Sequence, residues 1–265
     1  FKRIKKSETK CIVDTKWVLK WKLKGGVRHI RARLCLRGFK ESGCDNDTNH
    51  SATASRLSQR LLVSETVLRS WVLASTDIPK AFLQGVSYQE LADTTNKPLR
   101  DVSFTLNIQG TTCLRQIKGF EDFDPRSEVL HCLKPGTGCR DAPRCFSMQL
   151  RKVTAAFGLR SSFLDPEFEL LHDEGGTLQL VVIKHVDDLK IAGPKELIAR
   201  FVDHVARAFG KLVIEYNTFT FCGVRHTQEK DIVLDQAKFI AAIKEMAVPE
   251  AYAKTDEPLP EHLQK

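Results

Sequence analysis

Two adjacent aspartates, Asp187 and Asp188, follow one apolar segment and precede another. Neighbouring side chains of a regular strand point to opposite faces, so both carboxylates reach one site only at a hairpin tip. Carboxylates this close repel each other unless a divalent cation offsets the repulsion, and such hard oxygen ligands suit Mg²⁺ or Mn²⁺. Taken alone, the pair is more typical of a polar hairpin turn, in which Asp is common.

A third aspartate, Asp77, stands at the end of another apolar segment and is followed by a turn, in STDIPKAF (75–82). By itself Asp77 is more typical of a helix cap. One acid at a strand end and two on a neighbouring hairpin are nevertheless what two-metal phosphoryl transfer requires. There, one ion activates the attacking 3′-oxygen and the other stabilises the leaving pyrophosphate. The three aspartates together are therefore candidate ligands for two metal ions.

The charge of the chain is concentrated at one end. Residues 1–40 hold 14 Lys and Arg against two acids, a local excess of +12, so the remainder sums to 8 − 12 = −4. A basic arm on a nearly neutral body suits a polyanionic partner, because each neutralised phosphate releases counterions. A solvated basic face is the alternative interpretation.

A long hairpin is predicted within the basic arm, from Trp17 to Phe39, with its turn at Gly25-Gly26. In the returning strand Arg31, Arg33 and Arg37 share one parity and alternate with apolar residues. One face of that strand should therefore be cationic and the other apolar.

The remaining elements are predicted from apolar periodicity. A first helix is predicted at about 56–69, and it carries Leu57, Leu61 and Leu68. A second begins near Asp141 as N-cap, and a third at 195–209 ends at Gly210. The other predicted elements are a strand at 72–78, two strands within 178–193, a strand pair at 212–224 and a helix at 235–246; residues 84–128 give no clear pattern. Strands and helices without a regular βαβ period favour an α+β fold.

The bulk composition sets further bounds. At 265 residues the chain can form one large domain or two to three subdomains, and no apolar run has the roughly 18–20 residues of a membrane span. No signal peptide opens the sequence. None of the eight cysteines forms a C-x-x-C pair, so we interpret them as structural thiols of a reducing compartment.

Five blocks resemble the reverse transcriptases of copia-type (Pseudoviridae-like) retrotransposons, in the family's order. They cover about residues 13–245, and five motifs in order are far more specific than any one. The blocks are 17–41, similar to the opening W-V to K-A-R-L-V-A-R-G-F; 76–85, similar to D-V-x-x-A-F-L-x-G; 130–146, similar to L-x-K-x-L-Y-G-L-x-x-A-P-R-x-W; 181–193, similar to Y-V-D-D with its strands; and 219–240, similar to the closing F-L-G-I and L-x-Q segments.

The resemblance implies a right-hand polymerase with fingers, palm and partial thumb, in which an antiparallel palm sheet bears the carboxylates. It implies basic fingers at 1–70, a palm with the metal site at 71–225 and the start of a thumb or connection at 226–265. Residues 84–128 are a candidate insertion into the fingers.

The resemblance also implies a role for each matched residue. Asp77, Asp187 and Asp188 match the catalytic ligands of two Mg²⁺ or Mn²⁺ ions, and Ile78 would offer its backbone carbonyl to a metal. Phe82 matches the bulky residue that favours dNTP over rNTP. The nucleotide-binding candidates are Phe82, Arg31, Arg33, Arg37, Thr137 and Gly138, and the template or primer candidates are Ala142, Pro143, His185, Phe221, Cys222 and Gly223.

Some residues depart from the family pattern. His185 stands for the usual Tyr, Thr137 for the Tyr of L-Y-G, Asp141 for Gln or another polar residue, and Phe146 for Trp. The charge of His185 can vary with pH, and Thr137 removes an aromatic ring close to the nucleotide pocket. These changes leave the three aspartates complete but bear on efficiency.

The implied function is that of an enzyme, an RNA-directed DNA polymerase that uses an RNA template, a DNA primer and dNTP, without a membrane partner. The alternative is a decayed retroelement remnant that binds nucleic acid without polymerising. A metal-dependent nuclease would need further acids or histidines near the three aspartates, and the sequence offers none that are convincing. The resemblance implies a location in a cytoplasmic retroelement particle or in the nucleus.

Overall fold

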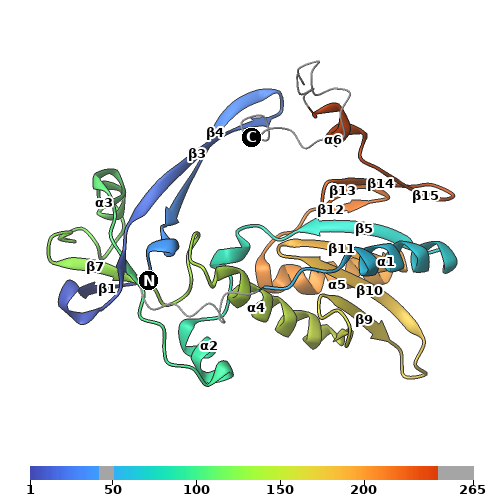
Figure 1. Ribbon diagram of the computed structural model, residues 1–265, viewed down its shortest axis with the longest axis horizontal. Coiled ribbons are helices and arrows are strands. Elements are labelled where there is room, and N and C mark those ends of the chain that lie inside the picture. Colours follow the sequence, from blue (N-terminus) through green and yellow to red (C-terminus); the bar gives the residue numbers. More distant parts are fainter. Residues whose placement is uncertain (42–50, 244–265) are drawn as a thin grey trace, which may run out of the picture.

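A computed structural model describes residues 1–41 and 51–243 of the chain, which form a mixed α and β structure (Figure 1). Its largest sheet has six antiparallel strands in the order β12-β5-β11-β10-β9-β8. These strands are β5 (Val72–Asp77), β8 (Arg160–Ser161), β9 (Phe168–His172), β10 (Leu178–His185), β11 (Asp188–Gly193) and β12 (Ile214–Tyr216).

The central strands of this sheet are buried on both faces. Side chains of one parity, such as Leu180 and Ile191, pack against α4 (Ala142–Phe157) and α5 (Lys195–Phe209). Side chains of the other parity, such as Ile183, pack against α1 (Arg56–Leu68) and the strands that follow Asn217. Burial on both faces explains why β10 reads as a continuous apolar run rather than as an alternating one.

The helices confirm most of the periodicity predictions. In α5 the apolar side chains Ile198, Phe201, Val205 and Phe209 are buried, and the helix ends before Gly210, as predicted, where φ is +90°. In α4 Phe146 and Leu150 are buried, Val153 and Phe157 pack partly against the same core, and Gly158 ends the helix at φ +106°.

The helix predicted at about 56–69 is confirmed as α1, but the leucines that mark it in the sequence are not its buried residues. Leu57, Leu61 and Leu68 are exposed, and the buried residues are Ser58, Leu62 and Thr66. The hydroxyls of Ser58 and Thr66 both have hydrogen-bond partners. The Thr66 hydroxyl donates to the Leu62 carbonyl at 2.7 Å, and the Ser58 hydroxyl donates to the carboxylate of Asp165 at 2.5 Å. Small residues with satisfied hydroxyls therefore let α1 lie close to the sheet.

A second region has its own sheet and core, and Figure 1 shows it on the left of the view. Its strands, in the order β1-β7-β6-β2, are β1 (Lys2–Lys5), β2 (Ile12–Val13), β6 (Ser103–Phe104) and β7 (Glu128–His131). Helices α2 (Tyr88–Thr95) and α3 (Ile108–Leu114) contribute Tyr88, Leu91 and Leu114 to its core. Residues 84–128, which gave no clear pattern, thus supply much of this region.

The predicted hairpin in the basic arm is confirmed as β3 (Thr15–Lys24) and β4 (Val27–Leu36). Gly25 and Gly26 form its turn with φ of +57° and +79°, a conformation that glycine adopts without steric cost. β3 and β4 form a two-stranded sheet of their own, which arches over the space between the two regions (Figure 1).

The last described elements form a three-stranded sheet of β13 (Thr218–Phe221), β14 (Val224–Gln228) and β15 (Ile232–Asp235). The strand pair predicted at 212–224 divides instead into β12, which joins the central sheet, and β13. The helix predicted at 235–246 is shorter among the described residues, where α6 spans Ala237–Ala241; positions beyond 243 lie outside them. None of the described helices is long and apolar enough to cross a membrane.

Candidate active site

Strand register brings the three aspartates together at one edge of the central sheet. Asp188, at the start of β11, pairs directly with Asp77, at the end of β5. Val186 and Asp187 form the tight turn between β10 and β11, and Val186 has a φ of +60°. This left-handed conformation is strained for a β-branched residue. The Ile78 amide donates to the Asp187 carbonyl at 3.0 Å, which ties the end of β5 to the turn.

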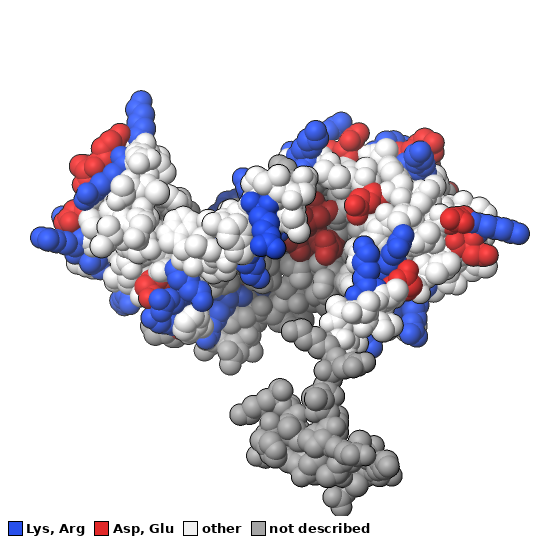
Figure 2. All heavy atoms as spheres, turned by 90° about the horizontal axis from the view of Figure 1, so that it is seen from above, with Lys and Arg blue, Asp and Glu red and all other residues white. Residues whose placement is uncertain are grey.

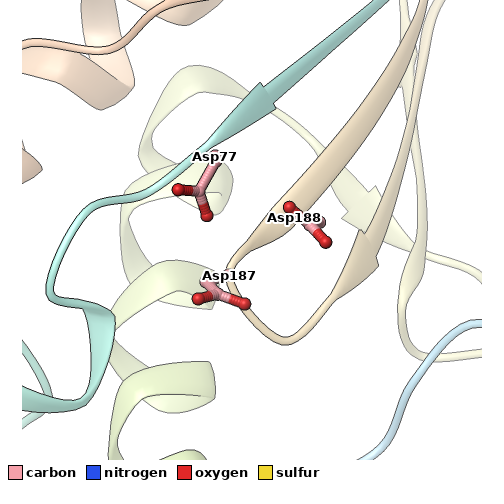
Figure 3. Close-up of side chains that lie close together, drawn as sticks. All are labelled: Asp77, Asp187 and Asp188. Atoms are coloured by element: carbon pink, nitrogen blue, oxygen red, sulfur yellow. The ribbon is translucent and has the colours of Figure 1, made fainter. Parts of the chain in front are cut away.

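The three carboxylates form one cluster (Figure 3). Asp77, Asp187 and Asp188 each offer an oxygen atom, and these atoms lie within 4.8 Å of one another. Asp77 is exposed and the other two are half-buried. Among the described residues, no side chain forms an ion pair with any of them. Three hard oxygen donors at this spacing fit a divalent cation.

Electrostatics at the cluster reflect this crowding. Burial and then the charge of Asp187 raise the pKa of Asp77, and the cations Arg31 and Lys22 partly offset the increase. Burial, followed by the charges of Asp187 and Asp77, also raises the pKa of Asp188, whereas His185 lowers it. The cluster therefore carries repulsion that an added positive charge would relieve.

A cavity of about 1030 Å³ opens beside the carboxylates, with Asp77 and Asp187 in its lining. Its lining includes four cationic residues, Arg31, Arg33, Lys80 and Lys134, among mostly apolar ones. Figure 2 shows acidic atoms gathered deep in the hollow at the middle of this face, with basic side chains near its rim. A concave site with acids at one end and cations around it suits a polyphosphate bound together with metal ions.

Phe82 lines the cavity from a short 3₁₀ turn, η4 (Ala81–Leu83), that follows β5. Lys80 precedes this turn in a left-handed conformation with φ +56°. The ring of Phe82 packs partly against both the central and the second core, which holds it between the two regions. Phe82, five residues after Asp77 in the sequence, therefore lines the same cavity as Asp77.

The loop before α4 also lines the cavity, through Gly136 and Thr137. The Thr137 carbonyl accepts a hydrogen bond from the Leu36 amide at 2.8 Å, which joins the loop to the base of the hairpin. Gly138 has a φ of +96°, and a Cβ there would lie 2.1 Å from the Leu36 carbonyl oxygen. Gly138 permits this close approach but is not among the residues that line the cavity.

The three candidate arginines separate in space. Arg31 and Arg33 extend from β4 into the cavity lining. Arg37 lies beyond the end of β4, where its guanidinium approaches the Asp14 carboxylate at 3.4 Å, and it is outside the lining. The alternating pattern of the three arginines does not reveal this difference, because the partner of Arg37, Asp14, is 23 positions earlier in the sequence.

The start of α4 agrees with the prediction only in part. Asp141 is the N-cap residue of α4, as predicted, but its side chain makes no capping hydrogen bond. Its fully buried carboxylate lies 3.6 Å from the Arg100 guanidinium and accepts a hydrogen bond from the Tyr88 hydroxyl at 3.4 Å. Ala142, which is buried, and Pro143, which is half-buried, follow in the first turn and do not line the cavity.

The remaining candidates lie near one another and do not line the cavity. The His185 ring lies 6.2 Å from the Phe221 ring in an edge-to-face arrangement, and its Nδ1 is buried without a partner among the described residues. Cys222 and Gly223 form the β13–β14 turn with φ of +49° and +77°. Burial and the charge of Asp188 raise the pKa of Cys222, which places this turn near the cluster.

Two lysines near the site were missed. Lys22, on β3, lowers the pKa of Asp77. It lies on the same face of the hairpin as Arg31, so the alternation that marked Arg31 in β4 would have indicated Lys22 in β3 as well. Lys190 is buried in β11, where its ammonium group lies 5.0 Å from the centre of the Phe221 ring and 3.4 Å from His226 Nε2. A lysine within an apolar strand was the only signal for it.

Sequence comparisons place the chain beside retrotransposon proteins, although no protein-family model matches it. It is 25% identical over 202 residues to the retrovirus-related Pol polyprotein from transposon RE1 of Arabidopsis thaliana, covering 75% of this chain and 12% of that protein. The Pol polyprotein from transposon RE2 of the same plant is 26% identical over 185 residues, 69% of this chain and 11% of that protein. The resemblance predicted from the five motif blocks is confirmed, and the chain spans about a tenth of these relatives' length.

Comparison with solved structures finds partial overlaps with two telomerases. The telomerase from Candida albicans, in complex with a fragment of telomeric RNA, overlaps at a TM-score of 0.43 and 12% identity, over 88% of this chain and 49% of that chain. The apo telomerase from Candida tropicalis overlaps at a TM-score of 0.39 and 12% identity, over 70% and 41%.

Proposed function

We propose that this chain is the RNA-directed DNA polymerase segment of a copia-type retrotransposon polyprotein, with a right-hand polymerase fold. The observation that carries the proposal is the convergence of Asp77, Asp187 and Asp188 within 4.8 Å beside a cavity whose lining includes four Lys and Arg residues. In this proposal the central antiparallel sheet is the palm, and the β3–β4 hairpin with the second region forms the fingers. The proposed substrates are dNTP and a DNA primer on an RNA template.

The proposed reaction is attack of the primer 3′-hydroxyl on the α-phosphate of a dNTP, which forms a P–O bond and releases pyrophosphate. Two Mg²⁺ or Mn²⁺ ions, held by Asp77, Asp187 and Asp188 and the Ile78 carbonyl, would activate the hydroxyl and stabilise the leaving group. The repulsion that raises the pKa of Asp77 and Asp188 supports this ligand set, because bound cations relieve it.

The chain's own side chains would then position the nucleotide. Arg31 and Arg33 line the same cavity as Asp77 and Asp187 and would bind the triphosphate through charge-assisted hydrogen bonds. Phe82, held between two cores, would restrict the space at the nucleotide 2′-position. Thr137 would adjoin the nucleotide from the loop before α4.

The primer and template would lie beside these groups. His185 and the turn Phe221-Cys222-Gly223 gather next to Asp188 and are the proposed primer contacts. Gly138, Ala142 and Pro143 lie behind the cavity lining, so any role they have in template binding would be through the position of the loop and of α4. The proposed location, a cytoplasmic retroelement particle or the nucleus, follows from the resemblance alone.

Primer extension on poly(rA)/oligo(dT) tests the proposal, with Mg²⁺ or Mn²⁺ added. We expect Asp187→Asn and Asp77→Asn to lower the extension rate at least about a hundredfold, because the cation ligands are lost. Asp203→Asn, an exposed carboxylate on α5, is the matched control and should leave the rate unchanged. Extension by Asp187→Asn at the parent rate would exclude the site. No extension by a parent chain that still binds template would instead support the decayed remnant.

A further inference from the structure

The β3–β4 hairpin presents a row of apolar side chains to solvent. Residues paired across an antiparallel hairpin lie on the same face, so the pairs Trp17–Leu34 and Trp21–Ile30 place both indoles on one face, together with Leu19. The exposed fraction rises toward the tip, from 39% for Trp17 to 62% for Leu19 and 68% for Trp21. Single exposed apolar residues are ordinary, but a contiguous row of this kind marks an interaction surface.

The charge of the hairpin restricts what can cover this face. Residues 15–36 contain seven Lys and Arg and no Asp or Glu. Pairs such as Lys20–Arg31 put most of these cations on the opposite face, which is also the face whose Arg31 and Lys22 act on Asp77. A second copy of the hairpin would bring seven more cations to the same contact, whereas a polyanion would neutralise those already present.

The apolar face is continuous with the cavity. Leu34 and Leu36, which share the face of Trp17, belong to the cavity lining, and Leu36 is buried. A strand that leaves the cavity along the hairpin therefore meets Trp17 first and Trp21 next. The two indoles lie four residues apart on one strand, a separation of about 13 Å, which is long enough for each to meet a different base.

We propose that this apolar face binds single-stranded nucleic acid, with Trp17 and Trp21 as base-stacking platforms. Every base offers a π-face, so stacking on exposed aromatic residues of a cationic ribbon binds a single strand without reading its sequence. The inference rests on the proposed function, because it gives the path of the unpaired strand beyond the cavity. It needs no catalysis, however, and is measured by binding alone.

Tryptophan fluorescence of the full chain tests the inference directly. The sequence has three tryptophans, so Trp71→Phe leaves only the two indoles of the hairpin as reporters. We expect a 20-nucleotide single strand of oligo(rA) to quench this fluorescence. Trp21→Ala should weaken binding about tenfold. Because Trp21 is 68% exposed, its replacement should leave the fold intact, which a thermal melt verifies.

Two further variants separate stacking from general apolar contact. Trp21→Phe keeps an aromatic face and should bind within about twofold of the parent, whereas Trp21→Leu keeps apolar area and should bind as weakly as Trp21→Ala. Parent-like binding by Trp21→Leu would overturn the inference. So would a parent chain that elutes as a dimer and becomes monomeric in Trp21→Ala, since the face would then bind a second copy.

The outcome is separable from that of the proposed function. In the Asp187→Asn variant, single-strand binding should persist at the parent affinity, because Asp187 lies outside the hairpin. If the parent does not extend primers but its binding depends on Trp21 as described, the polymerase proposal fails and the stacking surface stands. If extension depends on Asp187 but binding ignores Trp21, the stacking surface alone is overturned.

Discussion

The three aspartates lie where strands with two buried faces end, whereas the cations of the hairpin lie on a ribbon with no core of its own. In the central sheet, helices on one face and α1 on the other fix the register that sets Asp77 opposite Asp188. In the hairpin, pairing between two strands positions Arg31 and Arg33. Changes to the sheet should therefore cost stability and activity together, and changes to the outer hairpin should alter binding without altering stability.

The largest expected difference is in stability. Ile191→Ala, at a fully buried position of β11, should lower the free energy of unfolding by about 2–5 kcal/mol, because it leaves a cavity between the sheet and α5. Leu23→Ala, at a hairpin position that is 73% exposed, should change it by less than about 0.5 kcal/mol. Urea denaturation of both variants measures the contrast. A comparable loss from Leu23→Ala would show that the hairpin has a buried face after all.

Acid should lower the free energy of unfolding through His226 of β14. This ring is buried, donates from Nδ1 to the Val224 carbonyl at 3.1 Å, and turns Nε2 toward the Lys190 ammonium group. Burial and then the charge of Lys190 lower the pKa of His226 to about 4. The unfolded chain, with a pKa near 6.5, binds the proton more readily, so stability is complete above about pH 6.5 and falls as the pH approaches 4.

The full loss over this window is about 3 kcal/mol. Urea denaturation at pH 7 and at pH 4 measures it. His226→Gln is the matched control, because it removes the titrating ring and should flatten this part of the pH dependence. An equal fall in stability for parent and variant would assign the acid sensitivity to other groups.

How far the sequence predicts this molecule depends on whether the decisive partner is near or far along the chain. The helix α5 and the strands β10 and β11 follow from their own apolar periodicity, and the aspartates follow from where those strands end. The buried face of α1 does not, because Leu57 and Leu61 offer an equally regular stripe that the fold leaves exposed. The fit of smaller residues, such as Ser58 and Thr66, against the sheet decides which face of α1 is buried.

The same distinction applies within the candidate site. Asp77 meets Asp188 across 111 residues of sequence, yet each is marked by a local pattern, an acid at the end of an apolar segment. Asp141 is at the N-cap position predicted for it, but nothing near it in the sequence reveals that its carboxylate lies beside the Arg100 guanidinium instead of capping the helix. Arg37 likewise resembles Arg31 in spacing but is held by Asp14.

On the hairpin, nucleotide affinity should respond while stability does not. Arg31→Ala and Arg33→Ala should each raise the KM for dNTP about tenfold, because a charge-assisted contact to the triphosphate is lost, with little change in the melting temperature. Arg37→Ala is the contrasting variant, since this side chain lies outside the cavity lining, and its KM should stay near that of the parent. Steady-state extension at varied dNTP measures all three. Equal effects of Arg37→Ala and Arg31→Ala would contradict the division among the arginines.

The smallest expected effect is on the melting temperature with and without Mg²⁺, compared between variants of the central sheet and of the hairpin. Mg²⁺ at several times its dissociation constant should raise the melting temperature of the parent by about 2–4 °C, because it binds the folded carboxylates and relieves their repulsion. Asp188→Asn should abolish this increase. Without Mg²⁺ this variant should melt no lower than the parent, since the raised pKa of Asp188 means that its charge opposes folding at neutral pH. Leu23→Ala in the hairpin should keep the full increase in melting temperature with Mg²⁺. Loss of the increase in this variant would show that the hairpin holds the ion as well as the sheet.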